Sequence, residues 1–518
     1  MKKIVFWILL LCGASDAVWA QDKAAALEQA FIFSERAKSH VFLSQLNFFK
    51  DSEHIVGVPD SILAQENSLQ NNIIRLERLI ADYKTGSDSS NRKVYEQKLL
   101  TQKTLQERLE LQIKKTYPRY YDLRYGSAVP TIANIMKSLP PNTAIVSYFV
   151  GQDALFTFVI DPENNLRVFR SEPKQPITLQ VQNFNKTIMG QDKSNFISAS
   201  QQLFQELFAF TLPKSIKNLI LVPDIGLANL PFEALLTEPA SASSNYEALP
   251  YLLKKYNVMY STSASAYCQS LAESWNSAYK TDFVGVVPSF ENPAYSTVSK
   301  DVLAFFEDLQ VRDSTAYKSV LLGRDIRPLR HTLQELSSIK KIMEKTTLTT
   351  RFVEKQDANE MCIKLGAINE ARVVHLAAHT FINQEKPWLS GILMAQDSTS
   401  NQDGLLHIHE ILNTKLSAEL LMLTATHGGV GAARTGEGCL GMARAWFYAG
   451  AQRLGLSLWL NETVANEQLL SDFYTTLSTP SKKAIDYSTS LRKSKLKLIK
   501  SKEYSAPYFW SHLIMFGR

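Results

Sequence analysis

Between residues 60 and 120 the apolar positions recur at the spacing of a helix. A first stripe, with intervals of four and three, consists of Leu69, Ile73, Leu76, Ile80 and Tyr83. A second stripe consists of Tyr95, Leu99, Leu105, Leu109 and Ile113. The turn-forming residues 86–90 separate the two stripes. Two long amphipathic helices joined by a short polar turn predict an antiparallel helical hairpin.

An earlier helix is predicted from about residue 24 to residue 46, with Ala30, Ala37 and Val41 on one face. None of these helical segments carries residues that suggest catalysis. The helical region therefore offers either a docking surface for a partner or a cap on the domain that follows. We favour the cap.

After residue 140 the period becomes that of β-strands. Three short β-rich runs, at 144–150, 155–160 and 166–169, predict a meander or hairpins. Further along, helical stretches such as the one with Leu329, Leu333, Leu336 and Met343 alternate with apolar runs. These runs are 219–222, 283–287, 373–376, 420–423 and 454–458, with another expected strand at 509–516. The alternation predicts an α/β fold with a mostly parallel sheet and helices on both faces. Residues 300–325 lack a clear period and are expected to form a long loop.

The first twenty residues have the pattern of a secretory signal peptide. Lys2 and Lys3 precede the apolar run 4–11, and small residues flank Ala20, which predicts cleavage before Gln21. The run is shorter than the ~20 residues that span a bilayer, and no later segment is a candidate span. The mature protein is expected to be soluble and exported, either periplasmic or secreted. An uncleaved anchor is the alternative, and a lipid on Cys12 fits poorly because a large leucine precedes it.

Composition narrows the classes of function. The 518 residues are 45% hydrophobic and 20% charged, which excludes a disordered or collagen-like chain. The formal charge of +6 is too small to imply nucleic acid without a concentrated basic face. Cys268, Cys362 and Cys439 remain after the leader, without CxxC or zinc-like spacing. One disulfide with a free thiol and three buried thiols are both open, and no cofactor is expected.

Two strand ends carry candidate chemistry. In an open parallel sheet, ligands bind beyond the carboxyl ends of the strands. His379 follows the run 373–378, and Thr426 follows the run 420–425. If these two strands are neighbours, the two side chains lie side by side. The alternative for His379 is a hydrogen-bonded histidine at a strand end.

Other histidines near these strands suggest metal only weakly. His407, His409 and the adjacent Glu410 could contribute ligands, but no second motif with metal-ligand spacing accompanies them. His375 is expected to be structural, on the face opposite that of its strand neighbours. His427 precedes two glycines, which favours an exposed loop over a role as an additional base. We expect no metal site.

The segment 373–379 resembles the histidine loop of CHAT domains, which belong to the caspase-like group of cysteine peptidases. Residues 420–462 look like the companion motif of that family. Further segments match in the same order, namely 222–224, 230–235, 473–474 and 507–510. Residues 30–38 are similar to the helix that precedes this domain in members linked to tetratricopeptide (TPR) repeats.

The leader pattern and the resemblance together divide the chain into three regions. A signal peptide at 1–20 precedes a TPR-like helical region at 21–125, and a caspase-like CHAT domain occupies 135–518. Within the domain, residues 135–300 form the first half, and residues 325–518 carry the histidine and cysteine motifs.

The chain departs from the family at the nucleophile. Active relatives carry a cysteine in a Ser-Ala-Cys setting, where this chain has Thr424, Ala425 and Thr426. The glycine that usually follows the family's histidine is Thr380, which affects a backbone N–H expected to help hold an oxyanion. A hydroxyl is far less acidic than a thiol, whose pKa is about 8.5. Threonine nucleophiles use an N-terminal amine as base, and Thr426 lies deep inside the chain.

Three functions follow as hypotheses. The one we favour is an exported, catalytically degenerate peptidase homologue that binds a protein or peptide by strand addition. The second is an active peptidase in which Thr426 or Cys439 acts with His379. Cys439 would stand at the entrance to a helix expected from Leu440, where a helix N-terminus lowers a thiol's pKa. The third is a purely structural scaffold.

Overall fold

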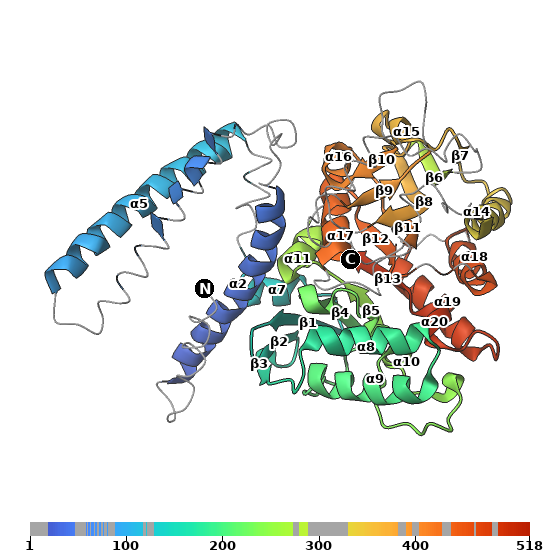
Figure 1. Cartoon of the computed structure of the whole chain (residues 1–518), viewed down its shortest axis with the longest axis horizontal. Coiled ribbons are helices and arrows are strands. Elements are labelled where there is room, and N and C mark those ends of the chain that lie inside the picture. Colours follow the sequence, from blue (N-terminus) through green and yellow to red (C-terminus); the bar gives the residue numbers. More distant parts are fainter. Residues whose placement is uncertain are drawn as a thin grey trace. The chain divides into compact units, whose positions relative to one another are not determined.

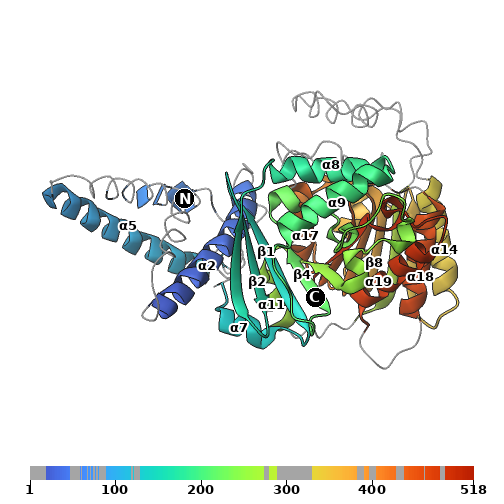
Figure 2. The same cartoon turned by 90° about the horizontal axis from the view of Figure 1, so that it is seen from below.

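One mixed sheet, with helices packed against it, forms the core of the larger part of the chain (Figure 1, Figure 2). The structure is a computed structural model. It describes residues 19–46, scattered positions between 59 and 80, and then 89–117, 121, 129–272, 279–288, 330–381, 390–395, 404–426, 437–459, 461, 463–478 and 485–517. Two compact units result, Met1–Glu35 together with Pro130–Arg518, and Arg36–Val129.

The middle of the sheet is mostly parallel. Its main path runs in the spatial order β10 (Leu405–His407), β9 (Gly391–Leu393), β8 (Ala371–Phe381), β11 (Leu420–Thr426), β12 (Arg453–Ser457), β13 (Leu513–Gly517), β5 (Asn257–Tyr260), β4 (Asn218–Val222), β1 (Thr143–Val150), β2 (Leu155–Asp161) and β3 (Asn165–Ser171). β6 (Thr281–Pro288) pairs in parallel with both β8 and β7 (Thr350–Lys355). Antiparallel pairs occur at β12–β13, in the β1–β2–β3 meander and at β8–β9–β10. The predicted fold class, a mostly parallel sheet with helices, is confirmed.

Helices follow most of the strands. They are α7 (Ile132–Ser138), α8 (Ile177–Met189), α9 (Lys193–Leu207), α10 (Leu252–Lys255), α11 (Ala264–Ala272), α14 (Arg330–Met343), α15 (Glu360–Lys364), α16 (Ile408–Asn413), α17 (Glu437–Ala449), α18 (Val464–Ser478), α19 (Tyr487–Lys500) and α20 (Pro507–Trp510). Short 3₁₀ turns, η2 (Ile225–Leu227), η3 (Phe232–Ala234) and η4 (Tyr246–Ala248), lie between β4 and β5. Asp192 and Asp486 cap α9 and α19 by accepting bonds from backbone N–H groups of the first turn.

The expected strand at 509–516 is wrong in its first half. Phe509 and Trp510 belong to the helical turn α20, and the strand begins at Leu513. Pro507 occupies the first position of this turn, where proline's fixed φ favours a helix start. The short strands β5, β7, β9 and β10 were not predicted, because they alternate too little or mix polar and apolar residues. The expected loop at 300–325 lies outside the described residues.

The N-terminal helix α2 (Trp19–Leu46) packs on the meander through its residues up to Glu35. Phe31 is fully buried, with its ring centroid 5.8 Å from that of Phe158 in β2. A carboxylate oxygen of Glu35 accepts bonds from the backbone N–H (2.9 Å) and hydroxyl (3.0 Å) of Ser265, in the first turn of α11. The expected face consisted of Ala30, which is buried, with Ala37 and Val41, and it did not include Phe31. This part of α2 caps the sheet.

The unit of residues 36–129 contains the predicted hairpin's second helix, α5 (Ser89–Thr116). Leu69 from the first stripe is buried together with Leu109 and Ile113 from the second. Leu105 is 41% exposed and does not belong to the buried stripe. α5 also begins inside the predicted turn 86–90. Its apolar contacts therefore link both predicted stripes.

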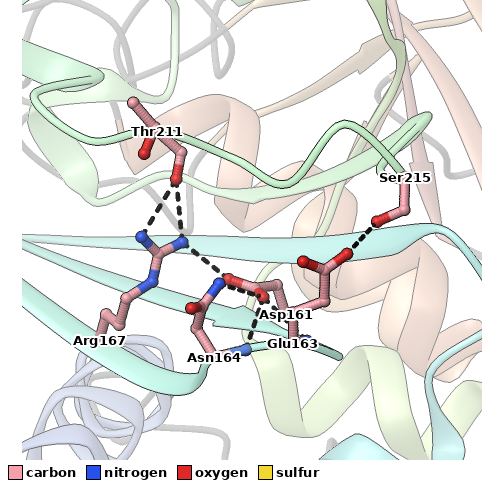
Figure 3. Close-up of polar contacts among 6 residues, drawn as sticks. All are labelled: Asp161, Glu163, Asn164, Arg167, Thr211 and Ser215. Atoms are coloured by element: carbon pink, nitrogen blue, oxygen red, sulfur yellow. Dashed lines mark hydrogen bonds and ion pairs between the residues drawn. The ribbon is translucent and has the colours of Figure 1, made fainter.

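The turn between β2 and β3 is held by one buried carboxylate, shown in Figure 3. Asp161 accepts bonds from the backbone N–H groups of Glu163 (3.1 Å) and Asn164 (2.9 Å). Its other oxygen lies 2.7 Å from the guanidinium of Arg167, which also donates to the carbonyl of Thr211. The turn is thereby fixed to the loop that follows α9.

The predicted signal peptide lies almost wholly outside the described residues, which begin at Trp19 in α2. Within the described segments, no helix combines the length and apolar character needed to cross a membrane.

Candidate functional site

The two candidate strand ends lie next to each other. β8 and β11 are parallel neighbours, and their register pairs Thr424 with Ala377 and then Thr426 with Thr380. The backbone of Thr426 therefore stands opposite the residue that follows His379. The side chain of Thr426 lies outside the described residues. Both positions are at the carboxyl edge of the sheet, where α/β folds bind ligands.

A β-bulge occurs at His379. Between the last two paired positions, β8 has two residues, Ala378 and His379, where β11 has only Ala425. An extra residue of this kind bends the strand and re-aims a side chain, and such bulges are frequent beside active sites. His379 is 8% exposed. Beyond the bulge, Thr380 pairs with Thr426 on one side and with Ile392 of β9 on the other.

The three cysteines after the leader are the candidates for an alternative thiol nucleophile. Cys439 is the third residue of α17, which begins at Glu437 and not near Leu440 as expected. Its side chain lies outside the described residues. Cys268 and Cys362 are free thiols, and burial raises the pKa of each to about 11. Both are protonated at neutral pH, so neither is an activated nucleophile.

His375 lies in a buried polar cluster. Its Nε2 is 2.9 Å from a carboxylate oxygen of Glu335 in α14, and its Nδ1 is 2.8 Å from the hydroxyl of Tyr474 in α18. Thr424 donates its hydroxyl to the same Glu335 oxygen at 2.8 Å. The trio resembles a Thr-His-Glu triad in composition only. In a triad the acid and the nucleophile use opposite ring nitrogens, whereas both lie at Nε2 of His375.

The cluster continues as a directed chain of hydrogen bonds. Asn461 donates to Nδ1 of His512 at 3.2 Å, so the proton of that neutral ring stays on Nε2. Nε2 then donates to the side-chain oxygen Oδ1 of Asn466 at 2.9 Å, and the side-chain NH₂ group of Asn466 donates to Glu335 at 2.8 Å. Burial, with a smaller contribution from the positive charge of Lys495, lowers the pKa of His512 to about 3.

Sequence reasoning missed Glu335, Asn466 and His512. Glu335 and Asn466 are 131 residues apart, so no local spacing connects them. The available signal was a polar residue beside the apolar positions of a buried helix, as with Glu335 next to Leu336. That signal indicates burial of a polar group but not its partner.

Glu410, which follows the candidate histidines, lies in the first turn of α16. Glu410 accepts a bond from the backbone N–H of His407 at 2.9 Å and lies 2.6 Å from the ammonium of Lys364. Its carboxylate therefore caps the helix. Over the described segments, no three His, Cys, Asp or Glu side chains are grouped to hold a metal ion. The side chains of His409 and His427 lie outside these segments.

A second buried contact lies in the motif 230–235. The ammonium of Lys495 is 2.8 Å from the carboxylate of Glu233, and both side chains are buried. Burial raises the pKa of Glu233 and lowers that of Lys495, and the attraction between the opposite charges works against both shifts. Next to it, the backbone N–H of Phe232 donates to the hydroxyl of Tyr260 at 3.0 Å. This motif therefore joins η3 to α19 and β5.

The mostly parallel sheet and its helices define the class of the domain as α/β. The chain belongs to the CHAT domain family, whose model matches residues 198–518. That stretch contains His379, Thr426 and the buried polar cluster. The family predicted from the sequence motifs is confirmed.

Other comparisons give remote likeness only. Two crystal structures of the Saccharomyces cerevisiae separase–securin complex, at 2.6 and 3.0 Å, are similar at 10% sequence identity, with TM-scores of 0.39 and 0.40. Each alignment covers 99% of this chain and 42% of the matched chain, so this chain spans less than half the length of that one. No curated protein matches it.

Proposed function

We propose that this protein is a catalytically degenerate CHAT domain protein that binds an extended stretch of polypeptide without cleaving it. The supporting observation is the register of β8 and β11, in which Thr426 lies opposite Thr380 and one residue from the level of His379. By the family resemblance, Thr426 occupies the position of the nucleophilic cysteine in active members. An alcohol replaces the thiol there.

Loss of the thiol removes the usual route to cleavage. A histidine readily deprotonates a thiol with a pKa near 8.5, but not an aliphatic hydroxyl without further help. The described free thiols, Cys268 and Cys362, have pKa values raised to about 11. Loss of a catalytic nucleophile commonly costs several powers of ten in rate. An extended peptide can be bound through hydrogen bonds to its backbone, which need no nucleophile and survive that loss.

Export forms part of the proposal. The basic start, short apolar run and small residues before Gln21 support secretion through the membrane, with the protein acting in the periplasm or outside the cell. A protein or peptide of that compartment is then the partner.

A binding and cleavage experiment tests the proposal. A fluorescein-labelled decapeptide, selected from a random library by the full chain, is incubated with wild type, Thr426→Ala, Cys439→Ala and His379→Ala. We expect mass spectrometry to recover the peptide intact from every sample, and Thr426→Ala to bind within about twofold of wild type. Cleavage that disappears in Thr426→Ala or Cys439→Ala would establish the active-peptidase hypothesis instead. Failure to select any binding peptide would favour the scaffold hypothesis.

The placement of the two side chains has its own test. In Thr426→Cys, a thiol beside His379 should have a lowered pKa and react faster with iodoacetamide at pH 6.5 than the same thiol in Thr426→Cys/His379→Ala. Equal alkylation rates would mean that the side chain at position 426 does not lie beside His379, and the proposal would lose its basis.

A further inference from the structure

Thr380 carries a buried hydroxyl without a hydrogen-bond partner. The residue is 3% exposed, and its Oγ1 has neither a protein partner nor appreciable contact with solvent. Its backbone is paired on both sides, with Thr426 of β11 and Ile392 of β9. A buried, unsatisfied hydroxyl reduces stability, and a valine of the same shape would avoid that cost. The fold alone therefore gives no reason for threonine at this position.

Two other buried threonines of this domain have hydrogen-bond partners. Thr424 donates to Glu335 at 2.8 Å, and Thr414 donates to the carbonyl of Ile411 at 2.7 Å. In the part of the chain that the structure describes, Thr380 is the threonine whose buried hydroxyl has no partner. The exception coincides with the bulge beside His379.

We infer that the Thr380 hydroxyl is a ligand-binding group, which forms a hydrogen bond with a backbone peptide group of the polypeptide bound at the ends of β8 and β11. This inference rests on the proposed function and names one contact within it. A hydroxyl already removed from water loses no solvent hydrogen bond when the ligand arrives, so the new bond keeps more of its strength. Because the side chain is nearly covered, the ligand must displace the atoms around the hydroxyl, which slows association.

The test uses the full chain and the labelled decapeptide selected by the wild type. Binding is measured by fluorescence anisotropy and melting by differential scanning fluorimetry, for Thr380→Val, Thr380→Ser and the matched control Thr414→Val. We expect Thr380→Val to bind about fivefold to tenfold more weakly and to melt at the same or a higher temperature. Thr380→Ser should bind within about twofold of wild type because it retains the hydroxyl. Thr414→Val should show the reverse, with unchanged binding and a lower melting temperature.

Two results would overturn the inference. Unchanged binding in Thr380→Val would show that no ligand contacts the hydroxyl. A melting temperature lowered as in Thr414→Val would show that the hydroxyl serves the fold. Failure of the proposed function is visible separately, in the wild type alone. If the wild type cleaves the peptide, the proposed function fails while the variants still report on the contact, and if it binds no peptide, both ideas fail.

Discussion

Replacing Glu335 with glutamine tests the buried hydrogen-bond chain with almost no change of volume. The carboxylate accepts hydrogen bonds from Thr424 and Asn466, each at 2.8 Å, and one of its oxygens lies 2.9 Å from Nε2 of His375. Glutamine offers one oxygen and one NH₂ group, so it cannot keep all three contacts in this geometry. If its oxygen stays with Thr424 and His375, its NH₂ group faces the amide of Asn466. A flip of Asn466 does not repair this, because its carbonyl accepts from His512.

The magnitude follows from the bonds affected. A hydrogen bond to a charged group contributes about 1.5–3 kcal/mol, and one such bond is lost. The two that remain lose charge assistance, which is about half their strength. Removing a buried charge returns part of its desolvation cost. We therefore expect Glu335→Gln to lower the free energy of unfolding by about 2–4 kcal/mol.

Urea unfolding of the full chain, followed by tryptophan fluorescence, measures this loss. The control is Glu354→Gln, since Glu354 is 38% exposed and 3.7 Å from Lys340, and we expect a change below about 0.5 kcal/mol. The variants Thr424→Val and Glu335→Gln/Thr424→Val complete a double-mutant cycle, in which the losses should be less than additive. If Glu335→Gln is no less stable than Glu354→Gln, or if the cycle is additive, the reasoning about this cluster is wrong.

Three further predictions concern other buried titratable groups. The pKa of His512 is about 3 in the folded protein and near 6.5 in the unfolded chain, so the free energy of unfolding should fall by about 1.4 kcal/mol per pH unit as the pH drops from 6.5 toward 3. Urea unfolding at pH 7.5, 6 and 5 should show this dependence in the wild type and a dependence smaller by one proton in His512→Asn. An equal dependence on pH in both proteins would contradict the prediction. Lys495→Met should lower the free energy of unfolding by about 3–5 kcal/mol because it leaves the buried carboxylate of Glu233 without its partner charge, whereas Glu233→Leu/Lys495→Met should lower it much less. Equal losses for the two variants in urea titrations would refute the ion pair. By the same assay, Asp161→Asn should lower the free energy of unfolding by about 1–3 kcal/mol, and Arg170→Gln, at the exposed pair with Glu172, by less than about 1 kcal/mol. A comparable loss in both variants would contradict the role of Asp161 in holding the β2–β3 turn shown in Figure 3.

Much of the fold could be predicted because its central strands are continuous apolar runs. Residues 219–222, 373–376 and 420–423 all became strands of the parallel region. β7 was missed because Arg351 and Glu354 interrupt its apolar pattern and half-expose it. At 509–516, apolar character was continuous across a helical turn and a strand, and only the proline before Phe509 marked the change.

The candidate site could be predicted only on the condition that the strands before His379 and Thr426 are neighbours in the sheet. The sequence placed His379 and Thr426 after two similar runs, and the pairing of β8 with β11 supplies the adjacency. The bulge at His379 leaves no trace in the sequence, since it depends on register with another strand. The same holds for Thr380, whose missing hydrogen bond becomes visible only when every neighbouring donor and acceptor has a position.

The place of β13 has a consequence for how the protein reaches its native state. Leu513–Gly517 comes after every other described strand in chain order, yet it stands between β12 and β5 at the centre of the sheet. Until this segment is synthesised, both of those strands present open edges that can pair with foreign chains. Assembly must then wait for a contact of very long sequence separation, which is slow. A molecule that stops before Leu513 would therefore lack the strand that pairs with both halves of the sheet, and it would be a natural substrate for chaperones and proteases.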